Sequence, residues 1–421
     1  MKGPYILYFI IFFSIYFILN YYVGKVIFKA FNNIFNIPTL VFRIIFWTLA
    51  SSYILSTLLN KYLPYNLIAF FSLIGSYWLI LLMYSLLTFP ILGLVNFILK
   101  KSSIFNNKVH IIETILMTLI FISILIIGTY NARNSYVKSF DINIEKLNQK
   151  ESLNIVMVSD IHLGNIVKND RLKSMVTEIN KLNPDLIIIA GDIIDSDFDI
   201  FLNNNMAVDF SNLKSKFGTF ATLGNHDIFT RKESDIVDIL KENSVTVLRD
   251  EVALVDNKFY IIGRDDITVN SISDTSRANL GELTKDLDKS KPLIVIDHNP
   301  KYINESLNTD IDLQLSGHTH RGQIFPANLI TNSIFEVDYG YLKKDNLNVV
   351  VSSGYGTWGP PLRVGSRSEI IQIKLKWKNE RMKNWAVLQT AQFTKSQFKN
   401  SLRVFPKLLT INSSLLLYFI A

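Results

Sequence analysis

The chain has 421 residues, which is long for one domain, and hydrophobic residues make up 49% of it. Its mean hydropathy is positive, so the composition excludes a simple soluble domain. The formal net charge of +7 suits a protein near anionic lipid or phosphate substrates, although solvated lysine-rich loops would give the same value. The chain contains no cysteine, so it uses no disulfide and either side of a membrane is compatible with it.

Four long apolar runs occupy the first part of the chain, at residues 4–22, 39–59, 68–98 and 111–129. They are almost free of ionisable groups, and the exceptions, Arg43 and Glu113, lie near the end of a run. Each run reaches the roughly 18 to 20 residues that are needed to cross a bilayer core. We therefore predict a transmembrane region of about four helices over residues 1–130.

Two of these runs have alternative interpretations. The first resembles a signal peptide, but it is longer than a usual apolar region and lacks a small-x-small cleavage site. The third contains Pro90, so it is either one kinked helix or a helix followed by a re-entrant piece. His110 and Glu113 lie at the mouth of the last run, where we expect interfacial residues rather than a transport path, because conduction needs polar groups deeper in the membrane.

The orientation of the region follows only weakly from its lysines and arginines. Loops 23–38 and 99–110 share one side and hold five of them, while four lie on the other side: Lys25, Lys29, Lys100, Lys101 and Lys108 against Lys2, Lys61, Arg133 and Lys138. This small difference leans toward an extracytoplasmic position for the rest of the chain.

Residues 131–150 are polar and rich in Asn, Lys and Ser, and we predict a linker there. An apolar strand pattern at 155–158 follows, then helical spacing over 168–182, then a second strand pattern at 185–190. A strand, a helix and a strand in this order form a βαβ unit, which predicts a parallel sheet.

Five strand patterns end in Asp, Asn or His. A single Asp-x-His after a strand is a weak signal, but five of the six histidines lie at these ends and only His110 does not. Strand ends that meet at one edge of a sheet bring such side chains together. Carboxylate, amide and imidazole without thiolate suit Mn, Fe or Zn in a hydrolytic site. The motifs are Asp160-x-His162, Gly191-Asp192, Gly224-Asn225-His226-Asp227, His298 and Gly317-His318-Thr319-His320.

These motifs, in this order and at these spacings, resemble the calcineurin-like metallophosphoesterase superfamily. The Gly-His-Thr-His-Arg-Gly-Gln-Ile form at 317–324, with Ser-Gly-Tyr-Gly at 353–356 and Pro-Leu-Arg at 361–363, is similar to its bacterial membrane-associated phosphodiesterase branch. The resemblance implies an α/β metallophosphoesterase domain over residues 151–378, a four-layer αββα sandwich. Strand patterns at 245–249, 258–262, 348–353 and 369–375 would supply its second sheet.

The same resemblance implies a role for each site residue. Asp160, His162 and His320 would hold one metal ion, Asn225, His298 and His318 the other, and Asp192 would bridge them. Two ions roughly 3.5 to 4 Å apart would activate a water as hydroxide for attack on phosphorus. His226 would protonate the leaving oxygen, with Asp227 orienting it. Arg321 and Arg363 are candidates for holding a substrate phosphate, or else form surface ion pairs.

We therefore predict a membrane-anchored phosphoesterase in a bacterial cell membrane. Its dinuclear metal site would hydrolyse a phosphodiester, phosphomonoester or pyrophosphate bond, and membrane tethering favours a lipid-linked substrate. A nuclease or nucleotide phosphodiesterase is the alternative, but no dense basic stripe with stacking aromatic residues indicates nucleic acid as a partner. A non-catalytic membrane scaffold would lack ligands, and every expected ligand type is present. Residues 379–421 form a basic, amphipathic tail without an assigned role, which we expect to be a surface-lying helix or a poorly ordered tail rather than a fifth span.

Overall fold

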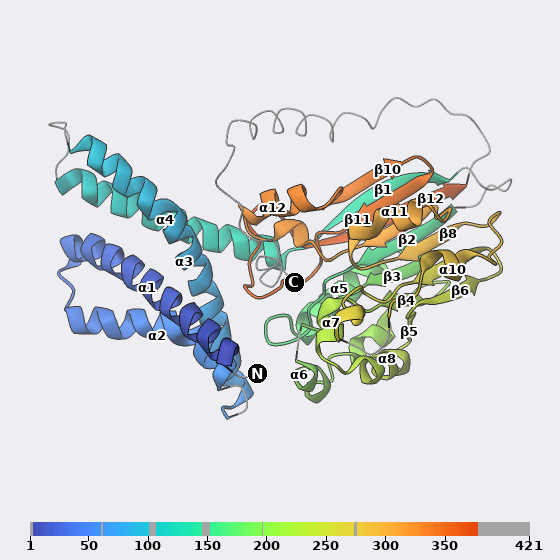
Figure 1. The fold of residues 1–421 in the computed structure, drawn as a ribbon, viewed down its shortest axis with the longest axis horizontal. Helices are drawn as coiled ribbons and strands as arrows, with labels where there is room; N and C mark the ends of the chain where they lie inside the picture. Colours follow the sequence, from blue (N-terminus) through green and yellow to red (C-terminus); the bar gives the residue numbers. More distant parts are fainter. Residues whose placement is uncertain are drawn as a thin grey trace.

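The structure is a computed structural model that describes residues 3–59, 62–100, 107–144, 152–195, 197–272 and 276–377. The tail predicted at residues 379–421 lies outside them. Figure 1 shows two regions, a set of four long helices and a domain built on two sheets.

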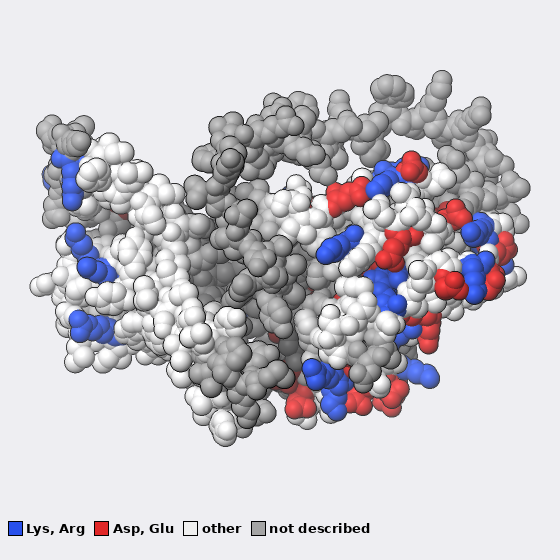
Figure 2. Space-filling model, viewed as in Figure 1, with Lys and Arg blue, Asp and Glu red and all other residues white. Residues whose placement is uncertain are grey.

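The four predicted membrane helices are confirmed as α1 (Gly3–Phe35), α2 (Thr39–Leu58), α3 (Tyr65–Leu99) and α4 (Asn107–Arg133). All four are long and apolar enough to cross a membrane. The third run is one helix that continues through Pro90, with no separate re-entrant piece. The surface of these helices is largely free of charge, as the white part of Figure 2 shows, which is what contact with lipid requires.

Small and polar side chains pack the helices together. Gly75 of α3 lies so close to α2 that a Cβ atom there would be 2.2 Å from the backbone nitrogen of Tyr53. Trp78 Nε1 donates to Asn20 Oδ1 at 2.9 Å, which joins α3 to α1. Close approach at glycine and hydrogen bonds between helices are the usual means of association in a bilayer, where burial of apolar surface gives little driving force.

The second region contains two six-stranded sheets. The first sheet has the order β1 (Tyr136–Ile144), β12 (Glu369–Trp377), β2 (Ser152–Val158), β3 (Leu186–Ala190), β4 (Thr219–Thr222) and β5 (Val245–Val247). The second has the order β10 (Gly340–Lys344), β11 (Leu347–Val351), β9 (Leu313–Ser316), β8 (Leu293–Ile296), β7 (Phe259–Gly263) and β6 (Glu251–Val255). The predicted βαβ unit is confirmed, because β2 and β3 are parallel and α5 (Asn169–Lys181) connects them.

The two sheets pack face to face through apolar side chains such as Met157, Ile188 and Leu315. The outer face of the first sheet is covered by α5, whose Met175 is fully buried in a separate apolar cluster there. The outer face of the second sheet is covered by α10 and α11. The fold is therefore the expected four-layer αββα sandwich. The remaining short helices are α6 (Phe198–Asn203), η1 (Val208–Asn212), α7 (Asn225–Phe229), α8 (Glu233–Glu242), α9 (Val269–Ile272), α10 (Leu280–Thr284), η2 (Pro300–Tyr302), α11 (Ile303–Leu307), η3 (His320–Gly322) and α12 (Ala327–Ile334).

The structure differs from the predicted linker at residues 131–150. The segment begins with the end of α4, and after two residues strand β1 pairs with β12 in parallel from Tyr136 to Ile144. Ile142 and Ile144 are buried, whereas the residues that alternate with them are partly or fully exposed. The polar residues of an edge strand gave this segment the composition of a linker.

The predicted membership of the second sheet was also partly wrong. The patterns at 258–262 and 348–353 correspond to β7 and β11 of that sheet, but those at 245–249 and 369–375 form β5 and β12 of the first. An apolar pattern indicates a strand without indicating its partner, and β12 returns from the far end of the domain to lie antiparallel to β2.

The two regions are in direct contact. Tyr84 OH of α3 donates to the Phe325 backbone oxygen at 2.8 Å, and the Arg363 backbone nitrogen donates to the Gly128 oxygen of α4 at 2.8 Å. Leu362 of the sandwich is fully buried in a cluster that includes Ile80 of α3. Loops of the sandwich therefore rest on α3 and α4.

Candidate metal centre

All seven predicted metal ligands lie in the loops that directly follow strands. Asp160 and His162 follow β2, Asp192 follows β3, Asn225 begins α7 after β4, His298 follows β8, and His318 and His320 follow β9. Six of these side chains are buried and His318 is half-buried. The strands come from both sheets, so the site forms where the edges of the two sheets meet.

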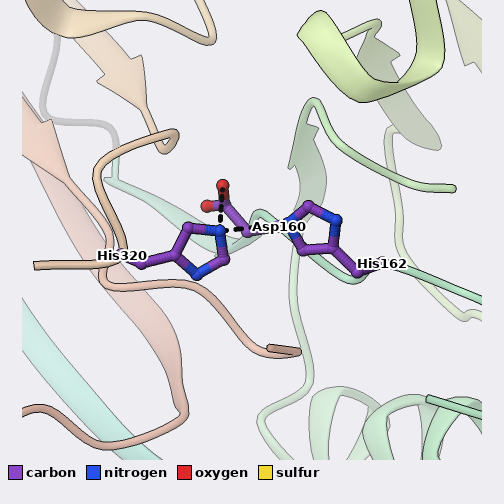
Figure 3. A group of neighbouring side chains, drawn as sticks. All are labelled: Asp160, His162 and His320. Carbon is purple, nitrogen blue, oxygen red and sulfur yellow. Dashed lines mark hydrogen bonds and ion pairs between the residues drawn. The ribbon is translucent and has the colours of Figure 1, made fainter. Parts of the chain in front are cut away.

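Asp160, His162 and His320 form the first group of converging ligand atoms (Figure 3). His162 Nε2 lies 3.0 Å from His320 Nε2, and His320 Nε2 lies 3.4 Å from Asp160 Oδ1. One ligand atom from each of the three residues lies within 4.8 Å of the others. This spacing fits a single metal ion held between them.

The second group contains Asn225, His298 and His318. Asn225 Oδ1 lies 2.9 Å from His318 Nδ1 and 3.2 Å from His298 Nε2. Asp192 Oδ2 lies 3.2 Å from His298 Nε2 and 3.8 Å from His162 Nε2 of the first group. Asp192 therefore contacts both groups, which is the position that a bridging carboxylate requires.

The backbone adopts the left-handed region at five of the ligand positions. The φ angles are 52° at Asp160, 52° at His162, 53° at Asp192, 71° at His318 and 48° at His320. Residues with a Cβ atom rarely adopt this conformation, and it persists where the surroundings enforce it. The motifs hold one another, because His162 N donates to the Asp192 backbone oxygen and His318 N to Asp160 Oδ1, at 3.0 and 2.9 Å.

Two glycines allow this close approach. A Cβ atom on Gly191 would lie 2.5 Å from His298 Nδ1, and one on Gly317 would lie 2.4 Å from Asp160 Oδ2. Any larger residue at either position would displace a predicted ligand. The glycines are therefore part of the site and not simple turn residues.

The protonation states of the site suit metal binding. Burial lowers the pKa of His162 and His320 well below the usual range, so both are neutral, as a metal ligand must be. Burial alone would raise the pKa of Asp192 and lower that of His298, but their mutual attraction holds the pKa of Asp192 well below and that of His298 well above the usual range. A metal cation bound between them would take the place of the His298 charge. His298 Nδ1 donates to the Ala190 oxygen at 2.8 Å, which directs its Nε2 at the second group. The donor set therefore fits divalent transition-metal ions.

His226 lies beside these ligands. Its ring centroid is 4.7 Å from that of His162, and its Nδ1 contacts the Asp195 backbone oxygen. A carbonyl oxygen only accepts, so Nδ1 carries a proton and donates it to this bond. Asp195 Oδ1 lies 3.7 Å from His162 Nδ1 and 3.8 Å from His226 Nδ1. The sequence prediction missed Asp195, and its signal was its position three residues after Asp192.

Asp227 does not hold the position expected for it. Its carboxylate accepts from the backbone nitrogens of Ile194, Gly224 and Ile193 at 2.8, 2.9 and 3.1 Å. Burial raises the pKa of this carboxyl to about 7. Asp227 thus joins the loop after Asp192 to the turn that carries Asn225, and the acceptor at the His226 ring is Asp195 instead.

Among the residues that the structure describes, neither predicted phosphate-binding arginine forms a surface ion pair. Arg363 is fully buried; its Nη2 donates to the Gly356 and Gly354 oxygens at 2.7 and 3.2 Å and lies 3.3 Å from His320 Nδ1. This arginine supports a ligand and a loop. Arg321 is half-buried and stacks on the ring of Tyr339, with its guanidinium carbon 4.6 Å from the ring centroid.

The family model for calcineurin-like phosphoesterases matches residues 153–322, which hold every predicted ligand. A metallophosphoesterase of Campylobacter jejuni is 31% identical over 286 residues, which cover 66% of this chain and 74% of that protein. A transmembrane protein with a metallophosphoesterase domain from Danio rerio is 30% identical over 328 residues, covering 73% of this chain and 72% of that protein. Among solved structures, NAD nucleotidase of Haemophilus influenzae matches with a TM-score of 0.35 and 16% identity, over 49% of this chain and 46% of that one. The chain belongs to the calcineurin-like phosphoesterase family and is a metal-dependent phosphohydrolase.

Proposed function

We propose that this membrane protein hydrolyses a lipid-linked phosphoester, as a diester, a monoester or a pyrophosphate. The observation that carries the proposal is an apolar surface beside the metal centre. Phe325 is 47% exposed, and Leu329 and Ile334 on α12 are 46% and 47% exposed. Phe335, which directly follows α12, has its ring centroid 6.1 Å from that of His318. The Phe325 oxygen accepts from Tyr84 of α3, so this surface continues onto a membrane helix. Exposed apolar residues in this position suit contact with lipid.

Two divalent ions, Mn, Fe or Zn, would occupy the site. Asp160, His162 and His320 would hold one, Asn225, His298 and His318 the other, with Asp192 shared between them. When bound, such ions polarise the phosphoryl group, activate water and offset the negative charge that develops on phosphate oxygens.

His226 would then transfer a proton to the leaving oxygen. The Asp195 oxygen holds the Nδ1 proton and fixes the direction of the ring, so the proton that can be transferred is the one on Nε2. Arg363 would act on the reaction only through His320 and the loop at Gly354 and Gly356.

We also propose that the sandwich lies on the extracytoplasmic side of a bacterial cell membrane. Figure 2 shows blue basic groups at the left, on the part of the helices that points away from the sandwich. The exposed basic residues of the halves of the helices near the α1–α2 and α3–α4 connections are Lys25, Lys29, Arg43, Lys100 and Lys108. Basic residues at helix ends favour the cytoplasm. Cysteine accessibility of single-cysteine variants in intact cells tests this orientation, since the chain has no cysteine of its own.

A substrate comparison tests the proposed reaction. The full chain in detergent, supplied with Mn, should release phosphate or alcohol from phosphatidylglycerol or a lipid pyrophosphate faster than it cleaves single-stranded DNA or a nucleotide diester. Faster cleavage of DNA would favour the nuclease alternative. No hydrolysis of any lipid, together with hydrolysis of soluble diesters, would contradict the lipid-linked substrate.

A further inference from the structure

A cavity of 230 Å³ lies between the membrane helices α2 and α3 and loops of the sandwich. We call it the hydroxyl-lined cavity and define it by six of its lining residues: Ser56 of α2, Ser72 and Ser76 of α3, and Asn165, Asp195 and Trp358 of the sandwich. It is smaller than the roughly 300 to 1,000 Å³ of sites for drug-sized ligands. Its size suits one small polar group and not an acyl chain.

The hydroxyl groups come from one face of each helix. Ser72 and Ser76 are four residues apart on α3, and Ser56 and Thr57 follow Tyr53 by one turn on α2. Residues three or four apart share a face of a helix. Both helices are otherwise strongly apolar, so a hydroxyl-bearing face turned toward the sandwich is a distinct feature of this pair.

Two polar atoms in the wall have no hydrogen-bond partner within the described part of the chain. They are Ser76 Oγ, on a residue that is 1% exposed, and Asn165 Oδ1. A buried polar group without a partner costs free energy, so such groups normally have one. Both atoms have almost no accessible surface, so a ligand in the cavity would instead contact the more exposed hydroxyl groups of the wall, those of Thr57 and Ser72.

The cavity adjoins the proposed proton donor. Asp195 lines the cavity, and its backbone oxygen holds His226. Trp358, which is 40% exposed, lies with its ring centroid 6.3 Å from that of His226. A group in the cavity therefore lies close to His226, next to the two residues that contact its ring.

The lining residues define the chemistry of the occupant. They include two carboxylates, Asp195 and Asp197, and no lysine or arginine, so the cavity does not suit a second phosphate. Hydroxyl, amide and carboxylate groups beside an aromatic ring suit a neutral group with several hydroxyls, because these side chains both donate and accept. We propose that the cavity binds the hydroxyl-bearing leaving group, a polyol or a sugar, of the lipid-linked phosphoester. This inference rests on the proposed function for the direction of bond cleavage.

A binding measurement tests the cavity without catalysis. Titration calorimetry on the full chain in detergent with Mn compares sn-glycerol 3-phosphate with inorganic phosphate. The parent protein should bind glycerol 3-phosphate about tenfold more tightly, which corresponds to one or two added hydrogen bonds. Ser76→Leu should abolish that preference and leave the Kd for inorganic phosphate within about twofold, because leucine fills the cavity away from the metal ligands.

Two further variants keep the test decisive. Ser72→Leu fills the same cavity from a half-buried position and should give the same loss even where Ser76→Leu disturbs packing between helices. Ser123→Leu makes the same change at an exposed position of α4 and should preserve the preference. Equal binding of the two ligands by the parent protein, or a preference that survives both filled variants, would overturn the proposal. Tighter binding of phosphoethanolamine than of glycerol 3-phosphate would overturn it in favour of an amine site.

A comparison of binding with hydrolysis distinguishes failure of the cavity proposal from failure of the proposed function. A competition experiment distinguishes a lipid headgroup from a soluble ligand. Binding preference without hydrolysis of any phosphoester would reject the proposed function and keep the cavity, whereas hydrolysis of a nitrophenyl diester without the preference would reject the cavity alone. Phosphatidylglycerol in mixed micelles should displace glycerol 3-phosphate, and phosphatidylcholine should not. Failure of phosphatidylglycerol to compete would overturn the lipid as the source of the headgroup.

Discussion

The membrane helices and the sandwich bury opposite kinds of side chains. On the helices, large apolar residues such as Ile18 and Ile126 are 65% and 64% exposed, while Asn20 is fully buried. In the sandwich, apolar residues such as Ile188 and Val295 fill the interior. The contrast follows from the solvent, because lipid accepts apolar surface at no cost and leaves polar groups to pair inside.

The two regions also differ in the chemistry of their buried polar groups. Those of the helices are hydroxyls and amides, which pair helices or line the cavity. All groups of metal-competent side chains found among the described residues lie in the sandwich. We infer that the sandwich carries out the reaction, whereas the helices attach the protein to the membrane and supply one wall of the proposed binding site. Changes that affect one region and not the other can test this division.

The largest expected effect is that of Asp192→Asn. Loss of the shared carboxylate should remove both metal ions and lower turnover by about 10⁴-fold or more, because metal activation supplies several kcal/mol of the rate. The metal content of the purified protein, measured as ions per chain, should fall from the value of about two that we expect for the parent. Glu113→Gln makes the same chemical change on α4 and should leave the metal content at the parent value. Unchanged metal in Asp192→Asn would remove the bridging role.

The next effect separates His226 from the ligands. His226→Ala should keep the metal content and lower turnover by roughly 10²- to 10⁴-fold for a diester with a poor leaving group. The loss should shrink for a nitrophenyl ester, whose leaving group needs little protonation. His318→Ala should lose metal and activity together for every substrate. If the His226→Ala defect is the same for good and poor leaving groups, His226 stabilises charge and does not donate a proton.

A third effect concerns where the sandwich begins. The full chain should stay in the membrane fraction after carbonate and high-salt washes, whereas a chain that begins at residue 134 should be largely soluble and hydrolyse a nitrophenyl diester. A chain that begins at residue 151 lacks β1 with its buried Ile142 and Ile144. Its melting temperature should be lower by about 10 °C or more, given roughly 2 kcal/mol for each buried isoleucine. Equal melting temperatures would show that β1 is dispensable.

The smallest effect on turnover should come from a change inside the helices. Gly75→Val places atoms where a Cβ is already 2.2 Å from the Tyr53 nitrogen, so it should separate α2 from α3 and lower the thermal stability in detergent. Turnover of a nitrophenyl diester, which has no hydroxyl-bearing headgroup, should stay within about twofold of the parent, because distant sites act independently. A loss as large as that in Asp192→Asn would mean that the two regions are not separable.

The sequence predicted the four helices and the strand-end ligands because both are local signals. A run of apolar residues and a motif such as Gly-His-Thr-His are read within twenty positions. The sequence could not show that β12 pairs with β2 or that β1 is a strand, because each pairing joins residues more than two hundred positions apart. Arg363 was predicted to hold a phosphate or to form a surface ion pair, and its burial could not be read, because its partners come from a folded loop at Gly354 and Gly356 and from His320.

The place of β12 in the first sheet has a consequence for biosynthesis. β12 lies between β1 and β2, and its last residue is Trp377, whereas β1 begins at Tyr136. While the ribosome makes the intervening chain, β1 has no neighbour and the sheet has an open edge beside β2. Such an edge is prone to wrong pairing, and contacts so distant in the chain form slowly. The nascent sandwich must therefore wait, tethered to α4, until its final strand leaves the ribosome and closes the sheet.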